Sequence, residues 1–317
     1  MDFGIFNGRL SGSIDTYKRT TKDLLWDYNV PMPPYLYSTI VANAGTMENK
    51  GIEVHLEGLI FTNSAFKWIT SINYSANQNK LVSLSNDKFI VQGGYFSTGF
   101  IGEPIQETTH RVEEGGKIGN FWTYQSVDID EDGHWVILGE DGNPKPISEA
   151  TANDKRVTGN GLPKYFLAWN NTFTYKNFDL EINMRGAFDY QIMNESRIFY
   201  ETPANLSRGN ILTAAYHDVF GKRPLNDFQD YKMLSYYIEN GDYWKIDNVT
   251  LGYNFNIKES SFIKQLRLYA SGLNLLVITG YKGIDPEVNI NGLAPGVDYR
   301  DRYPATRSYS FGVNLIF

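Results

Sequence analysis

The sequence predicts an all-β fold, a transmembrane antiparallel β-barrel or part of one, and three observations support this. Several segments alternate apolar and polar residues over a whole membrane thickness, longer than the usual globular strand of about 5–6 residues. Aromatic residues make up 15% of the chain beside 29 Gly and only 12 Pro, a composition that favours pleated surfaces and turns. The last segment, 309–317, alternates in the same way and ends on an aromatic residue.

The predicted strands follow one another along the chain. The Asn7-Gly8 pair tolerates positive φ and predicts a tight hairpin turn near the start. The next strand places Ile52, Val54, Leu56 and Ile60 opposite Glu53, His55 and Glu57, and the following one gathers Phe66, Trp68, Ile72 and Tyr74 on one face. A barrel with lipid outside and water inside requires this two-residue repeat.

The same pattern continues in the second half of the chain. Apolar residues on one face of each segment are Leu167, Trp169, Phe173 and Tyr175, then Phe178, Leu180, Ile182 and Met184, then Val249, Leu251, Tyr253 and Phe255. Asp179, Glu181, Asn183 and Arg185 form the charged face of the middle segment. Tyr74, Trp169, Tyr175 and Trp244 are predicted to belong to aromatic girdles at the lipid boundary.

The connections between these strands alternate in length. Long polar stretches lie at about 20–50, 80–97, 128–163, 190–241 and 277–303. Outer-membrane barrels have short periplasmic turns and long extracellular loops. A periplasmic carboxy-terminus then requires a further strand pair near 99–113 and 119–127, which gives about eleven strands. Single-chain bacterial barrels have even strand numbers, so the odd count and the absence of a signal peptide after Met1 predict a fragment.

Charge and composition exclude several classes of protein. The net charge of −7 argues against nucleic-acid binding, which calls for a basic patch. Cys is absent, which excludes disulfides and thiolate sites. No apolar run approaches the roughly 20 residues of a transmembrane helix, so any membrane role falls to strands.

Seven motifs occur in order along almost the whole chain. They are YKRTTKDLL (17–25), NAGTMENKGIEVHLEG (43–58), GGKIGNFWTYQSVDID (115–130), DKRVTGNGLPKYFLAWNNTFTYKNFDL (154–180), SYYIENGDYWKIDNVTLGYNF (235–255), LRLYASGLNLLVITGYKGIDPEVN (266–289) and YPATRSYSFGVNLIF (303–317). This ordered series resembles the SusC/RagA family of TonB-dependent transporters, found in the outer membranes of Bacteroidota.

The resemblance implies a 22-stranded barrel plugged by an amino-terminal domain and paired with a SusD-like lipoprotein lid. Residues 1–317 would be the carboxy-terminal portion of that barrel domain, with the plug and the first barrel half absent. The implied partners are the lid, TonB acting through the plug, outer-membrane lipid, and a glycan or oligopeptide substrate. The leading hypothesis is therefore a fragment of an outer-membrane importer.

Two alternatives belong to other classes. One is a porin-like or structural outer-membrane barrel without TonB coupling. The other is a soluble carbohydrate-binding β protein, whose strands should be short and whose apolar faces should pair inside.

Catalytic chemistry is disfavoured, because the four His, at 55, 110, 134 and 217, are dispersed and lack metalloprotease or hydrolase spacing. His55 is expected to face the lumen. Asp128, Asp130 and Asp132 begin like a calcium loop, in which alternate carboxylates converge on a hard cation. The twelfth position is Gly139 rather than a bidentate Glu. The 128–141 loop is thus either a Ca²⁺ site or a solvated acidic loop, and no other cofactor is expected.

Two further groups leave alternatives open. Arg185 and Arg267 are predicted inward, where they either line a substrate path or pair with carboxylates absent from this chain. Trp26, Tyr28, Tyr35 and Tyr37 crowd one loop with Pro31, Pro33 and Pro34, where they either stack on a ligand or form the loop's own small core.

Overall fold

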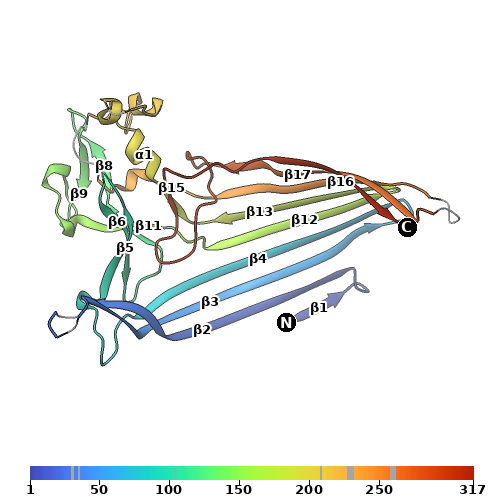
Figure 1. Cartoon of the computed structure of the whole chain (residues 1–317), viewed down its shortest axis with the longest axis horizontal. Coiled ribbons are helices and arrows are strands. Elements are labelled where there is room, and N and C mark those ends of the chain that lie inside the picture. Colours follow the sequence, from blue (N-terminus) through green and yellow to red (C-terminus); the bar gives the residue numbers. More distant parts are fainter. Residues whose placement is uncertain (30–31, 35, 104, 208, 227–231, 258–261) are drawn as a thin grey trace.

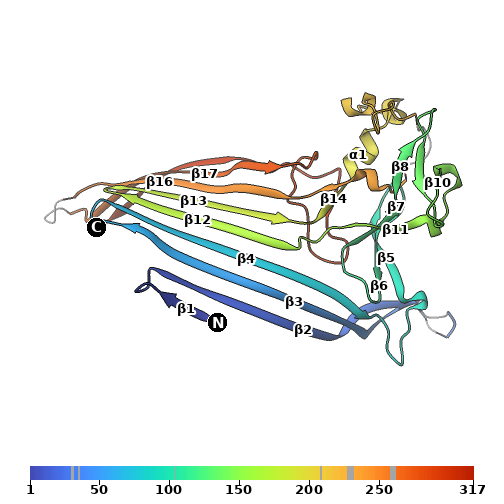
Figure 2. The same ribbon diagram turned by 180° about the vertical axis from the view of Figure 1, so that it is seen from behind.

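One long antiparallel sheet dominates the computed structural model, which describes residues 1–317 except 30–31, 35, 104, 208, 227–231 and 258–261. Its nine strands run in the order β1-β2-β3-β4-β12-β13-β16-β17-β19 (Figures 1 and 2). They are β1 (Asp2–Ile5), β2 (Leu10–Asn29), β3 (Thr39–Thr62), β4 (Phe66–Ser83), β12 (Tyr165–Tyr175), β13 (Phe178–Phe188), β16 (Tyr243–Asn254), β17 (Gln265–Thr279) and β19 (Ser308–Ile316). The all-β prediction is confirmed.

The strand pair predicted near 99–113 and 119–127 does not belong to the large sheet, and that prediction is wrong. These residues form β5 (Tyr95–Ile101), β6 (Glu107–Glu113) and β7 (Asn120–Tyr124), which join β11 (Lys155–Asn160) in a separate sheet. Thr109, His110, Val112, Phe121 and Thr123 are at most 1% exposed, so side chains from both faces of these short strands are buried in protein. Without this pair, the eleven predicted wall strands become the nine observed among the described residues.

The register gives the large sheet one apolar and one polar face, because successive side chains of a strand point to opposite sides. Val54 lies opposite Ile14 and Tyr74, in an apolar row across three strands. His55 lies opposite Ser13 and Asn73, in a polar row one residue away. Large side chains on the apolar face remain exposed, among them Ile14, Ile72, Trp169, Leu251, Leu268 and Phe311. So much contiguous exposed apolar surface marks a face that is covered in the cell by lipid or protein.

Aromatic side chains border the apolar face at both ends. At the end that carries the long loops, the ring centroids of Tyr74 and Tyr165 are 5.9 Å apart, and those of Phe188 and Trp244 are 6.3 Å apart. At the opposite end, Phe178 stacks edge-on against Tyr253 at 4.7 Å. The predicted girdle positions of Tyr74 and Trp244 agree with the aromatic band at the end that carries the long loops, which we call the upper aromatic band.

Trp169 differs from the other predicted girdle residues, because it lies in the middle of the apolar face. Its indole N–H donates to Thr70 Oγ1 at 2.8 Å. Asn171 Oδ1 accepts from Trp68 Nε1 at 3.1 Å and from Thr70 Oγ1 at 3.0 Å, and Asn171 is only 4% exposed. The polar atoms on this face therefore satisfy one another, as a hydrocarbon environment requires.

The long loops fold into a compact body at one end of the large sheet (Figure 1). Two further small sheets contain β8 (Ser126–Ile129), β9 (Trp135–Leu138) and β10 (Pro144–Pro146), and β14 (Gln191–Asn194), β15 (Ile238–Asn240) and β18 (Val297–Asp298). The body also holds α1 (Glu195–Tyr200) and 3₁₀ turns at Gln92–Gly94, Ile147–Glu149, Ala152–Asp154, Pro203–Ser207, Thr213–Tyr216 and Ser235–Tyr237.

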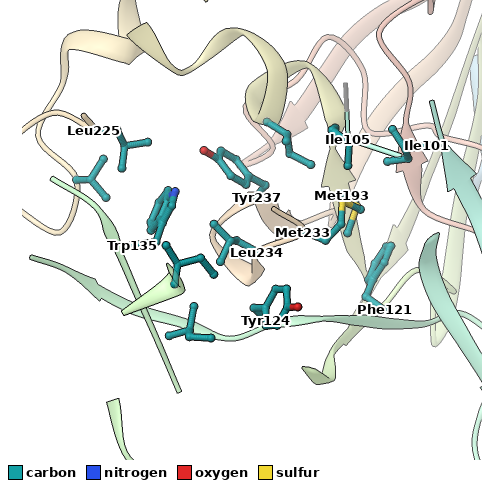
Figure 3. Close-up of a cluster of buried hydrophobic side chains, with 14 of the residues drawn as sticks. Ile101, Ile105, Phe121, Tyr124, Trp135, Met193, Leu225, Met233, Leu234 and Tyr237 are labelled. Carbon is teal, nitrogen blue, oxygen red and sulfur yellow. The ribbon is translucent and has the colours of Figure 1, made fainter. Parts of the chain in front are cut away.

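The loop body has a hydrophobic core of its own, drawn in Figure 3. Phe121, Trp135, Met193 and Leu234 meet there, although they come from widely separated loops, and each is at most 2% exposed. The long loops are therefore one packed unit. No helix within the described residues is both long and apolar enough to cross a membrane.

Candidate functional site

The candidate site is a groove on the polar face of the large sheet, below the loop body. It consists of two adjoining cavities of about 620 and 1010 Å³, which share Pro163, Phe166 and Ile290. Cavities of this size fall in the range, or just above it, of small-molecule sites in proteins. The groove is therefore large enough for a solute of several rings or residues.

Polar residues of three adjacent strands form one side of the groove. Asp15, Glu53, His55, Asn73 and Ser75 line the smaller cavity. His55 Nδ1 and Asn73 Oδ1 are 2.7 Å apart, so the imidazole is held by a neighbouring strand. The prediction that His55 faces inward, on the polar side, agrees with this position.

A segment of the 277–303 loop covers the opposite side, and we call residues 285–290 the strap. Pro286, Glu287, Val288 and Ile290 of the strap line the smaller cavity. The Tyr190 hydroxyl donates to Pro286 O at 2.9 Å, and Tyr190 and Val288 belong to one buried cluster. The strap is thus attached by a hydrogen bond and by apolar packing to the rest of the groove, whose floor is the large sheet; we call this sheet the wall.

An ionic cluster adds a third attachment. Glu287 lies 2.5 Å from Arg185 Nη1, contacts Lys245 Nζ, and accepts from the Tyr243 hydroxyl at 3.3 Å. Asp247 accepts from Arg185 Nε at 2.9 Å and lies 3.7 Å from Lys245 Nζ. Two cations and two carboxylates therefore balance, and only Glu287 comes from the strap.

Arg267, the second predicted inward arginine, lies on β17 and pairs with Asp179 of β13. Its Nη2 is 2.5 Å from Asp179 Oδ2, and Asn254 donates to the same carboxylate at 2.8 Å. Pairing of both arginines is confirmed. The expectation that their partners are absent from the chain is wrong, because Asp179, Asp247 and Glu287 supply them. The sequence pattern shows which side these residues face, but it does not show which loop folds back onto them.

The acidic 128–141 loop contains the hairpin of β8 and β9 in the loop body, and none of its residues lines the groove. Asp128 pairs with Lys222 at 2.6 Å, and this hydrogen-bonded ammonium lowers the pKa of the Asp128 carboxyl. Asp130 Oδ1 accepts the backbone N–H groups of Asp132 and His134 at 3.0 and 2.8 Å. In the part of the chain that is described, no three His, Asp or Glu side chains converge as metal ligands. A calcium site at Asp128, Asp130 and Asp132 stays a prediction.

Trp26 and Tyr28 lie on β2 rather than in a loop, so that part of the prediction is wrong, but both residues support the self-packing alternative. Tyr28 is 3% exposed and donates to Leu84 O at 2.6 Å. The Trp26 ring lies 5.1 Å from that of Phe96. Tyr37 is 77% exposed, whereas Tyr35 and Pro31 lie outside the described residues.

Comparison with curated proteins gives relatives along the entire chain. It is 29% identical to TonB-dependent receptor P3 of Formosa agariphila and 28% identical to TonB-dependent receptor SusC of Bacteroides thetaiotaomicron. All of this chain is matched, against 33% and 31% of those two proteins. The chain therefore spans about a third of the length of the relatives it matches. No protein-family model matches it.

Comparison with solved structures shows which known proteins share the fold of this chain. The RagAB peptide transporter superposes with a TM-score of 0.79 at 22% identity, covering 99% of this chain and 34% of that one. The RagAB peptide importer in its open-open state gives a TM-score of 0.80. The resemblance to the SusC/RagA family that the motifs indicate is confirmed.

Proposed function

We propose that this chain forms part of the outer-membrane wall of a TonB-dependent importer of the SusC/RagA type, and that its polar groove borders the path of the solute. The single observation that carries the proposal is the match of the entire chain to TonB-dependent receptors. The exposed apolar face and the groove behind it support the same reading, since one side of such a wall meets lipid and the other meets water.

The proposed solute is a glycan or an oligopeptide, and the proposed partners are a SusD-like lipoprotein and TonB. The smaller cavity of the groove favours polar solutes without a large net charge. Arg185 and Lys245 are already neutralised by Asp247 and Glu287, whereas His55, Asn73 and Ser75 offer hydrogen bonds. A fold neighbour named as a peptide transporter supports the oligopeptide class, and the glycan class is what the resemblance of the motifs implies.

Uptake in living cells tests the proposal. A strain that lacks the protein should lose uptake of an oligosaccharide or oligopeptide from a defined panel, and the wild-type gene should restore it. Removal of TonB should abolish that uptake as well. Uptake that persists without TonB would instead support a porin-like barrel. Recovery of the protein as a stable monomer without detergent would support a soluble binding protein and refute the membrane assignment.

A further inference from the structure

Three lysines and one glutamate, which we call the basic patch, gather on the apolar side of the large sheet just beyond the end of its apolar surface. They are Lys18 of β2, Lys50 and Glu48 of β3, and Lys80 of β4. The register places Lys18 opposite Lys50, and Glu48 opposite Lys80. Four charged residues on three neighbouring strands therefore lie side by side.

The register also fixes which way the basic patch faces. Arg185 contacts the strap, and the row Arg185, Ala168, Asn73, His55, Ser13 continues that polar face across the sheet. Lys18 is five residues beyond Ser13, an odd number, so its side chain points to the opposite, apolar face. Lys50 and Lys80 share that face through their paired positions, so Lys18 and Lys50, which also border the larger cavity of the groove, direct their side chains away from it.

The patch follows directly on the apolar surface. On β3 the apolar-face residues are Leu56, Val54 and Ile52, and the next position on that face is Lys50. On β4, Tyr74 of the upper aromatic band is followed by Ala76, Gln78 and Lys80. A lysine in this position projects from the hydrocarbon boundary towards the headgroup layer.

The charges of the patch are incompletely balanced within the chain. Lys18 lies 2.8 Å from Glu48, and its side chain remains 64% exposed. For Lys50 and Lys80, no carboxylate of the described residues comes within ion-pair distance. Like charges on opposite residues of neighbouring strands are destabilising. The basic patch therefore carries a net positive charge, although the whole chain has a net charge of −7, and this local charge calls for an anionic partner.

We propose that the basic patch binds the phosphate groups of a phosphorylated lipid in the outer leaflet of the membrane around the barrel. This inference rests on the proposed membrane location. The ligand is a lipid headgroup rather than free phosphate, because the patch adjoins the apolar surface on which acyl chains lie. The phosphate of a bound lipid reduces the repulsion between the ammonium groups of Lys18 and Lys50, and the bound lipid holds this edge of the sheet in the bilayer.

Native mass spectrometry tests the proposal on the complete outer-membrane protein that contains this chain. The protein is exposed to phosphatidylcholine vesicles that carry lipid A, repurified in detergent, and scored for retained lipid A. The Lys50→Gln/Lys80→Gln variant should bind lipid A about thirtyfold more weakly at low salt, the factor that two lysines near an anionic lipid surface supply. The matched Lys88→Gln/Lys282→Gln variant removes two exposed ammonium groups from loops and should bind as the wild type does.

Two further arms identify the source of the phosphate. Lipid A without phosphates should not be retained, and inorganic phosphate at an equal phosphate concentration should not displace the lipid. Equal retention by both double variants, with the protein still in the outer-membrane fraction, would overturn the inference and leave the proposed function intact. Absence of the wild-type protein from that fraction would refute the proposed function itself.

Discussion

Glu287→Gln is expected to loosen the strap from the wall of the groove. Glu287 is the strap's only member of the ionic cluster, where it meets Arg185, Lys245 and the Tyr243 hydroxyl. Glutamine has nearly the same shape and keeps one acceptor oxygen, but it removes the negative charge. The substitution therefore tests the electrostatic attachment and leaves the apolar packing around Val288 in place.

The size of the effect follows from burial. The Lys245 side chain is 3% exposed, and removal of one partner from a buried ion pair costs about 3–5 kcal/mol. The Arg185 side chain is 42% exposed, so water screens its share of the loss. Asp247 also stays 3.7 Å from Lys245 and compensates in part. We expect a cost of about 2 kcal/mol, or a roughly thirtyfold rise in the open fraction of the strap.

Hydrogen exchange measured by mass spectrometry checks this expectation. Val288 is 8% exposed, and its amide donates to Pro286 O at 2.9 Å within the strap, so burial protects this amide while the strap is docked. Exchange in peptides covering 285–290 should accelerate about thirtyfold in the variant. Glu181→Gln is the control, because Glu181 is an exposed carboxylate on β13 that bonds only locally to Asn183. Unchanged exchange after Glu287→Gln, or equal acceleration in the control, would refute the reasoning.

Three other predictions concern the wall, the loop body and the acidic loop. Asn171→Ala should destabilise the wall by about 1–3 kcal/mol in urea unfolding, because the Trp68 indole N–H loses its acceptor, and an unchanged midpoint would contradict this. Burial lowers the pKa of His110 to about 4, while its Nε2–H donates to Pro295 O. An unfolded His takes up its proton near pH 6.5, so the stability that neutral, buried His110 contributes is complete above that pH and is lost as the pH falls towards 4. NMR of the His rings, with His110→Asn as the reference, should show a pKa near 4 for His110. A His110 pKa near 6.5 would disprove the prediction. Calcium at Asp128, Asp130 and Asp132 must displace the Lys222 ammonium, so Lys222→Gln should tighten Ca²⁺ binding in calorimetry and Asp130→Asn should weaken it, whereas no saturable heat would exclude the site.

Alternation allowed the sequence to predict the wall strands because the two faces of a wall meet different solvents. β13 shows this clearly, since Leu180 and Ile182 share one face and Glu181 and Asn183 share the other. The Asn7-Gly8 turn was predictable for a local reason, and both residues have positive φ. These features depend only on neighbours in the sequence.

The loop body and the groove depend on long-range contacts and were not predictable in the same way. The strands around His110 and Phe121 alternate much as wall strands do, but both of their faces meet protein. Glu287 reaches Arg185 across about a hundred residues of chain, so no spacing rule connects them. The charged Glu287 next to Pro286 is a local signal that could have drawn attention to the strap.

Spin labels along β13 test the central claim most directly, and residues 1–317 contain no native Cys that would compete with an introduced cysteine for the label. Labels at 180, 182 and 184 should be accessible to oxygen dissolved in the bilayer, and labels at 181 and 183 should be accessible to a water-soluble nickel complex. The account predicts this two-residue alternation across the strand in the membrane-embedded protein. Equal accessibility at all five positions, or nickel access at Leu180 and Ile182, would contradict a wall with lipid on one side and water on the other.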